Sequence, residues 1–296
     1  MPPARATERS RRQKTVSLAA VASMLLLATL ETSACLIIQT SALPEAATPI
    51  PGWDENKYQV QKMIAALVER DKRLASMQTP AVMEYRAGDQ HVKAKEEIVV
   101  RRPDNLRVEA LSPFGVALLL AAQGSQLAIF EPDKNRFMRG QATADTLYRY
   151  VRIPMAPADA VGLLMGLAPP AFALNASADS VSNQGGMMVA SYGNLASGPR
   201  ELGFSAGNLA MVRETAGDGR VNYEVRYTDY HDIGGVMFPY VVDANFPAAG
   251  SHVTFHYLRP IVNGDIPDST FVLIPAPGAT LINLGRGAGR PFSNES

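Results

Sequence analysis

The stretch "RPDNLRVEALSPFGVALLLAA", from Arg102 to Ala122, decides the fold. In its first part, Leu106, Val108 and Ala110 alternate with charged residues, which is the pattern of a half-buried antiparallel strand. "SPFG" then supplies a tight turn, because proline fixes φ and glycine permits positive φ. The run "VALLLAA" is apolar without alternation, so both faces of the second strand should be dry. The stretch therefore predicts a hairpin inside a β-rich body.

Short runs with a strand pattern also occur on both sides of this hairpin in the sequence. Short β-prone runs alternate with Gly, Pro, Asp and Asn turn signals, and "GDG" at residues 217–219 should join two strands. Eleven further runs have a strand pattern: "AVMEYRA", "KEEIVVRRP", "QLAIFEPD", "NRFMRG", "GMMVASY", "LGFSA", "LAMVRET", "VNYEVRYTDY", "VMFPYVVDANF", "HVTFHYL" and "STFVLI". From all these runs we expect about ten to twelve strands. Adjacent carboxylates such as Glu96 and Glu97 should point to opposite faces of their strand, and we expect both to be solvated.

Three segments have a helical pattern instead. Apolar residues recur at three- and four-residue steps from Val60 to Val68, with Glu69 and Arg70 assigned to the polar side, and predict a helix over Glu55 to Leu74. Thr143 can cap a second helix, and "PADAVGLLMG" predicts a third, which begins near Pro157. The expected fold is mainly β with α: a strongly curved antiparallel sheet, or incomplete β-barrel, with a helical lid against its concave face.

The first 34 residues have the features of an export signal. A basic segment precedes an apolar run over residues 16–30, which falls short of the about 20 apolar residues of a membrane span. "TSAC" ends at Cys35, the only cysteine of the 296 residues, so an intramolecular disulfide is excluded. An ordinary signal peptide with a chance cysteine is the alternative, and "SRRQK" leaves a twin-arginine export route open.

"TSAC" resembles the lipobox of bacterial lipoproteins. The resemblance implies cleavage before Cys35 and acylation of its thiol and new amino terminus, giving a palmitate-type anchor. Because Leu36 follows where an Asp would mark inner-membrane retention, it also implies the outer membrane, facing the periplasm. We therefore expect a lipoprotein signal peptide at 1–34, a lipid-anchored flexible tether at 35–54, an incomplete barrel at 55–284 and a disordered tail at 285–296.

The region from Arg101 to Pro170 resembles LolB-like outer-membrane lipoprotein receptors of the LolA/LolB-like superfamily. "SPFG" matches the family's Asn/Ser-Pro-apolar-Gly turn between two strands. Downstream, "TLYRYVRIPMAPADAVGLLMGLAP" matches a short helix, an apolar-Pro loop and a second helix, with Arg152 in place of the loop glycine. The resemblance implies an apolar cavity for acyl chains under a helical lid, and lipoproteins received from a soluble periplasmic carrier for insertion into the outer membrane.

The family's protruding loop implies a membrane-contact role for Pro113, Phe114 and Gly115. A phenylalanine in a turn is unusual, and the alternative is that its ring folds back into the core. The all-apolar strand, the first helix and the abundance of methionine, which suits adaptable apolar surfaces, indicate a cavity. The candidate lining residues are Met63, Ile64, Leu67, Leu118 and Leu120.

Other classes of function lack support in the sequence. Without its signal, the chain has 23 basic and 26 acidic residues, a net charge of −3, which gives no indication of nucleic-acid binding. No G-x-S-x-G elbow, P-loop or H-E-x-x-H motif is present, so we expect neither an enzyme nor a cofactor. His252 and His256 lie on a predicted strand, about 13 Å apart, too far to share a metal ion.

We expect a monomer. The rival function is an envelope module on the same fold that binds or senses another hydrophobic ligand or a protein partner.

Overall fold

The computed structural model describes residues 54–169, 172, 174, 177–193 and 198–284. The predicted signal peptide, Cys35, the tether up to residue 53 and the tail from residue 285 lie outside the described residues. Among the helices of the described part, none combines the length and apolarity that a membrane crossing needs.

Helix α1 (Glu55–Arg73) begins and ends where the apolar period predicts, within one residue. The carboxylate of Asp54 caps its amino end and accepts hydrogen bonds from the backbone N–H groups of Asn56 and Lys57, at 3.0 and 3.2 Å. Such a cap satisfies donors that the first helical turn leaves without partners. The helix buries Val60, Ile64 and Leu67 against the sheet.

The described strands form one curved sheet of 15 strands that does not close on itself. Its order is β15-β6-β5-β4-β3-β2-β1-β13-β12-β11-β10-β9-β8-β7, with β14 beside β1, and only β15 and β6 pair in parallel. The mainly β fold with an unclosed antiparallel sheet is thus confirmed. The strands are β1 (Ser76–Ala87), β2 (Gln90–Arg101), β3 (Asn105–Ser112), β4 (Gly115–Gln123), β5 (Gln126–Glu131), β6 (Arg136–Gln141), β7 (Ser180–Gln184), β8 (Met187–Tyr192), β9 (Arg200–Ser205), β10 (Asn208–Thr215), β11 (Val221–Ile233), β12 (Val236–Phe246), β13 (Ser251–Tyr257), β14 (Ile261–Val262) and β15 (Thr280–Leu284).

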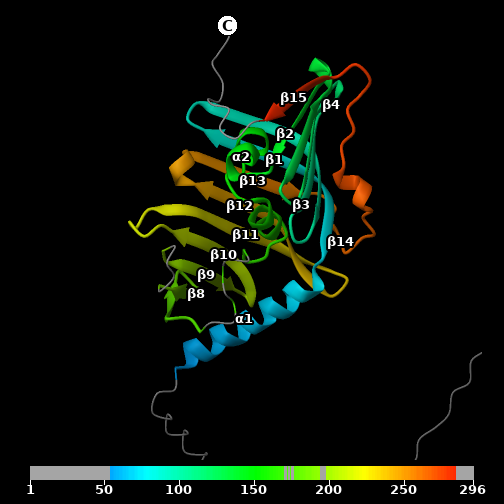
Figure 1. Cartoon of the computed structure of the whole chain (residues 1–296). Coiled ribbons are helices and arrows are strands. Elements are labelled where there is room, and N and C mark those ends of the chain that lie inside the picture. The colour runs from blue at the N-terminus through cyan, green and yellow to red at the C-terminus, as the bar shows by residue number, and fades with distance from the viewer. Residues whose placement is uncertain (1–53, 170–171, 173, 175–176, 194–197, 285–296) are drawn as a thin grey trace, which may run out of the picture. The chain divides into compact units, whose positions relative to one another are not determined.

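Two short helices fill the concave face of this sheet (Figure 1). Helix α2 (Ala144–Val151) has Thr143 as its cap, as predicted, and α3 (Pro157–Leu164) begins at the predicted proline. Their apolar side chains join those of the sheet in one large core. Because the sheet wraps this core without closing, the space between sheet and helices is where cavities can form.

The C-terminal segment covers the convex face of β2 to β6. The predicted strand "STFVLI" is wrong: residues Asp268–Phe271 form a 3-10 helix and extended chain follows. Prolines at 267, 275 and 277 flank this segment and remove backbone donors that a strand would need. Phe271 packs against Val99, and Leu273 against Ala121 and Phe137. This segment covers the outer face of β4 at Leu119 and Ala121. Leu120, Ala121 and Ala122 are buried, but residues 116–119 are only half-buried, so the second half of "VALLLAA" is dry on both faces and the first half is not.

Candidate functional site

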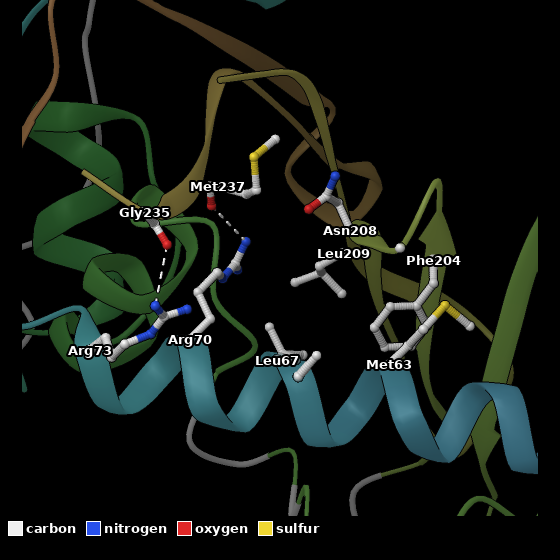
Figure 2. A pocket seen from close by; sticks show the side chains of 11 residues that line it. Met63, Leu67, Arg70, Arg73, Phe204, Asn208, Leu209, Gly235 and Met237 are labelled. Atoms are coloured by element: carbon white, nitrogen blue, oxygen red, sulfur yellow. Dashed lines mark hydrogen bonds between the residues drawn. The ribbon is translucent and has the colours of Figure 1, made fainter. Parts of the chain in front are cut away.

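A first pocket lies between α1 and the strand ends of β9, β10 and β12 (Figure 2). We call it the α1 pocket; its volume is about 230 Å³. Apolar side chains make one part of its wall and arginines the other, while two glycine turns complete it. The lining residues are Met63, Ala66, Leu67, Arg70, Arg73, Phe204, Gly207, Asn208, Leu209, Gly235 and Met237.

Arg70 is the unexpected member of this wall. The sequence assigns it to the polar side of α1, yet it is only 7% exposed, so that assignment is wrong. Its spacing from Met63 and Leu67, seven and three residues, places all three on one helical face. The helical period of the apolar residues therefore places Arg70 on the buried face. A charged side chain at such a position is nevertheless normally expected to be exposed to solvent.

A second pocket lies against the concave side of β1 to β4, next to the end of α2. We call it the Glu96 pocket; its volume is about 180 Å³. Most of its lining is apolar, with the guanidinium of Arg152 placed over the ring of Tyr85, 5.0 Å from its centroid. The lining residues are Met83, Tyr85, Val92, Ala94, Glu96, Val108, Ala110, Leu118, Tyr150, Val151 and Arg152.

The expectation that Glu96 is solvated is wrong. Its side chain points to the concave face and the residue is 6% exposed. Burial disfavours the charged form and raises the pKa of Glu96 from its ordinary value of 4.5 to about 7. The alternation of the strand does place Glu96 and Glu97 on opposite faces of β2. The face with Glu96 is the inner, concave one. The carboxyl is a polar group in a mainly apolar cavity, whose other charged lining residue is Arg152.

The predicted cavity residues divide into two groups. Met63 and Leu67 line the α1 pocket, and Leu118 lines the Glu96 pocket. Ile64 and Leu120 lie in the core next to these pockets, 1% and 0% exposed. Core packing and cavity lining use the same apolar periodicity, so sequence alone does not distinguish them.

The "SPFG" turn joins β3 to β4 and holds Phe114 out in solvent. The ring is 99% exposed, so it does not fold back into the core. The Ser112 hydroxyl accepts a hydrogen bond from the Phe114 N–H at 3.2 Å and donates one to the Gly115 carbonyl at 3.0 Å. Gly115 has a φ of 123°, which glycine adopts at little cost. The turn is thus fixed by its own hydrogen bonds and presents an apolar ring without support from the body.

Comparisons with known proteins identify the fold. No family model matches the chain, and no curated protein does. A DUF1329 family protein from Desulfovibrio piger has a TM-score of 0.51 and 8% identity, over 74% of this chain and 98% of its own. An outer membrane lipoprotein-sorting protein domain from Vibrio parahaemolyticus has a TM-score of 0.51 and 7% identity, over 71% and 95%.

The third similar structure has a superfamily assignment. A LolA superfamily protein from Nitrosomonas europaea has a TM-score of 0.50 and 13% identity, over 71% of this chain and 97% of its own. Identities this low establish similarity of fold alone. The folded body of this chain therefore has a LolA-like fold: an unclosed antiparallel sheet with helices on its concave face.

Proposed function

We propose that this chain is a LolB-like lipoprotein of the outer membrane that binds acyl chains and helps receive and insert lipoproteins there. The observation that carries the proposal is the exposed Phe114 on a turn of a body that contains two pockets with largely apolar walls. Moving one phenylalanine ring from water into an apolar phase is worth about 1.5–3 kcal/mol, so a fully exposed ring on a turn favours contact with such a phase. The LolA-like fold, shared with the lipoprotein-sorting domain from Vibrio, supports the same function.

In the proposed function, the parts of the chain have separate roles. Cys35 is acylated and anchors the chain at the periplasmic side of the outer membrane. Pockets lined by residues such as Met63, Leu67 and Leu118 receive acyl chains from a soluble periplasmic carrier. Phe114, held by Pro113 and Gly115, contacts the bilayer and brings the pocket opening towards it. In this function the chain acts as a monomeric receptor and carries out no covalent chemistry.

The experiment that tests this function is a transfer assay. The acylated full chain is reconstituted into lipid vesicles and mixed with a soluble LolA-type carrier loaded with a fluorescently labelled lipoprotein. We expect the label to leave the carrier and to sediment with the vesicles. Vesicles without the chain provide the control. Label that remains on the carrier would contradict the receptor function.

A second function has one observation in its favour. The α1 pocket contains two arginines, whereas the chains of a lipoprotein anchor are neutral. A module of the envelope that binds or senses another hydrophobic ligand would use such a charged wall. In that case, the transfer assay fails while a fatty-acid probe still binds saturably.

A further inference from the structure

We infer that the α1 pocket binds the head group of an anionic single-chain amphiphile, a fatty-acid carboxylate or a lysophospholipid phosphate, with Arg70 and Arg73 as its anion contacts. This inference rests on the proposed binding of acyl chains and adds a second ligand to it, since the neutral chains of a lipoprotein anchor have no anionic head group. The pocket combines an apolar wall with two cations. A neutral acyl ester needs the first but not the second.

Backbone carbonyl groups accept hydrogen bonds from only some of the N–H donors of the two guanidinium groups. Arg70 donates from Nη1 to the Met237 carbonyl at 3.4 Å and from Nη2 to the Gly166 carbonyl. Its Nε–H is buried and has no hydrogen-bond acceptor in the described part of the chain. Arg73 donates one bond, from Nη1 to the Gly235 carbonyl at 3.2 Å (Figure 2). A guanidinium has five N–H donors, so both arginines retain donors for a further acceptor.

Carboxylates do not neutralise these charges. The acidic neighbours on α1 are paired elsewhere: Glu69 with Lys72 at 2.7 Å and Asp71 with Arg102 at 2.7 Å. Within the described residues, neither Arg70 nor Arg73 forms an ion pair with a carboxylate. Arginine stays protonated in proteins, so the pocket keeps two positive charges next to an apolar wall.

Burial distinguishes Arg70 from an ordinary basic residue at a helix end. Basic side chains in the last turn complement the helix dipole from solvent, and Lys72, with a side chain 65% exposed, does so here. Arg70 is only 7% exposed, and a buried cation is costly unless an anion or several acceptors compensate for lost water. The two neutral carbonyl groups offset part of the free-energy cost of burying the charge of Arg70, and a bound anion would offset the rest.

The remaining wall is suited to the start of an alkyl chain. Met63, Leu67, Phe204 and Leu209 face the same space as the arginines (Figure 2). A volume of about 230 Å³ holds about seven groups of the size of water or methylene, each about 30 Å³. This is enough for a head group and the first carbons, while the rest of the chain must leave through the open side.

Photocrosslinking on the full chain tests the inference. The acylated chain in neutral-lipid vesicles is exposed to three photoactivatable probes with the same 16-carbon tail: palmitate, a lysophosphatidylglycerol and the neutral hexadecanol. We expect saturable labelling of α1 and the β9–β12 region by the anionic probes. Arg73→Gln should lower this labelling up to about fivefold, because Arg73 is exposed and water screens its pairing with an anion. Labelling by hexadecanol should change less than about twofold.

Control variants separate this inference from the proposed function. Lys72→Gln removes the same charge from the same helix outside the pocket and should leave all labelling unchanged. Arg70→Lys keeps the buried charge and should retain more labelling than Arg70→Gln. Comparing palmitate with lysophosphatidylglycerol shows whether a carboxylate or a phosphate is preferred. Equal labelling by anionic and neutral probes, or no effect of Arg73→Gln, would overturn the head-group inference alone. If no probe labels the chain saturably, acyl-chain binding itself is wrong.

Discussion

The hydroxyl of Tyr257 on β13 donates a 2.8 Å hydrogen bond to the carbonyl oxygen of Leu164 at the end of α3. Both groups are buried, and burial raises the pKa of Tyr257 well above its ordinary value of 10.0, so the hydroxyl stays protonated and donates. The bond connects the concave face of the sheet to the helix that covers it. It therefore ties α3 to the sheet against which it packs.

Removing this bond should loosen the attachment of α3 to the sheet without changing the apolar packing. Tyr257→Phe keeps the ring and leaves the Leu164 carbonyl without its donor, which should lower the free energy of unfolding by about 1–3 kcal/mol. Urea denaturation measures the difference. Tyr240→Phe, on the neighbouring strand β12 and only partly buried, is the matched control and should change stability by less than about 0.5 kcal/mol. Equal stabilities of Tyr257→Phe and the unaltered chain would show that the bond does not position α3.

Glu96 should make stability depend on pH. Its pKa is raised from 4.5 to about 7 in the folded state, so the folded state binds the proton more tightly than the unfolded one. Ionising the buried carboxyl therefore penalises the folded state. This penalty is absent below pH 4.5, grows as pH rises through the window up to about 7, and is then constant. Glu96→Gln cannot ionise and should be more stable than the unaltered chain at pH 8, by at most about 3 kcal/mol.

Urea denaturation between pH 5 and pH 8 checks this sign. The stability difference between Glu96→Gln and the unaltered chain should shrink towards pH 5. Glu97→Gln, the adjacent residue on the other face of β2, is the control and should not reproduce the pattern. A pH-independent difference for Glu96→Gln would show that the carboxyl does not titrate in this range.

Much of the architecture could be predicted because it follows from local patterns. The alternation in β3, the "SPFG" turn and the period of α1 each specify one element, and their sum specifies the curved sheet. The predicted number of strands, about ten to twelve, is too low. Strand β14 has only two residues, too few for a pattern, and β7, "SVSNQ", is mostly polar and largely exposed. Strand β15 has five residues and pairs with β6, far away in the sequence.

The polar residues of the pockets could not be predicted, for a different physical reason. Glu96 and Arg70 are charged residues at inward positions, and a charge normally indicates solvent. Only tertiary packing shows that the concave side of β2 and the inner face of α1 enclose them. Similarly, Phe271 and Leu273 cover the sheet from a segment more than 140 residues away from Ala121, a contact that no local pattern contains.

The lipid anchor leads to a prediction about fractionation. We predict that Cys35 is acylated, because it directly follows the small residues Ser33 and Ala34 after the apolar run. Each buried CH₂ contributes about 0.8 kcal/mol, so two or three chains hold the protein on the membrane. Cys35→Ser should therefore take up no labelled palmitate and remain an uncleaved precursor, held at the inner membrane by its signal segment and absent from the outer-membrane fraction. If Cys35→Ser is processed normally and still sediments with membranes, the anchor lies elsewhere.

Phe114 should determine cargo delivery and not membrane residence. Placing one phenylalanine ring in an apolar phase is worth about 1.5–3 kcal/mol, far less than acyl chains contribute. The ring is 99% exposed, so a charged replacement leaves no cavity and buries no carboxylate. Phe114→Glu should keep its melting temperature, acylation and probe binding, yet transfer of the labelled lipoprotein from carrier to vesicles should fall markedly, because the turn no longer enters the bilayer.

The specificity of this effect requires a matched surface change. Ile274 is 82% exposed in the C-terminal segment, and Ile274→Glu introduces the same charge in place of another exposed apolar side chain. Ile274→Glu should transfer normally, so that a loss confined to Phe114→Glu identifies the turn and not general surface charge. Phe114→Trp keeps an aromatic ring suited to the membrane interface and should retain transfer. A large drop in melting temperature for Phe114→Glu, or normal transfer by it, would exclude the turn as the membrane contact.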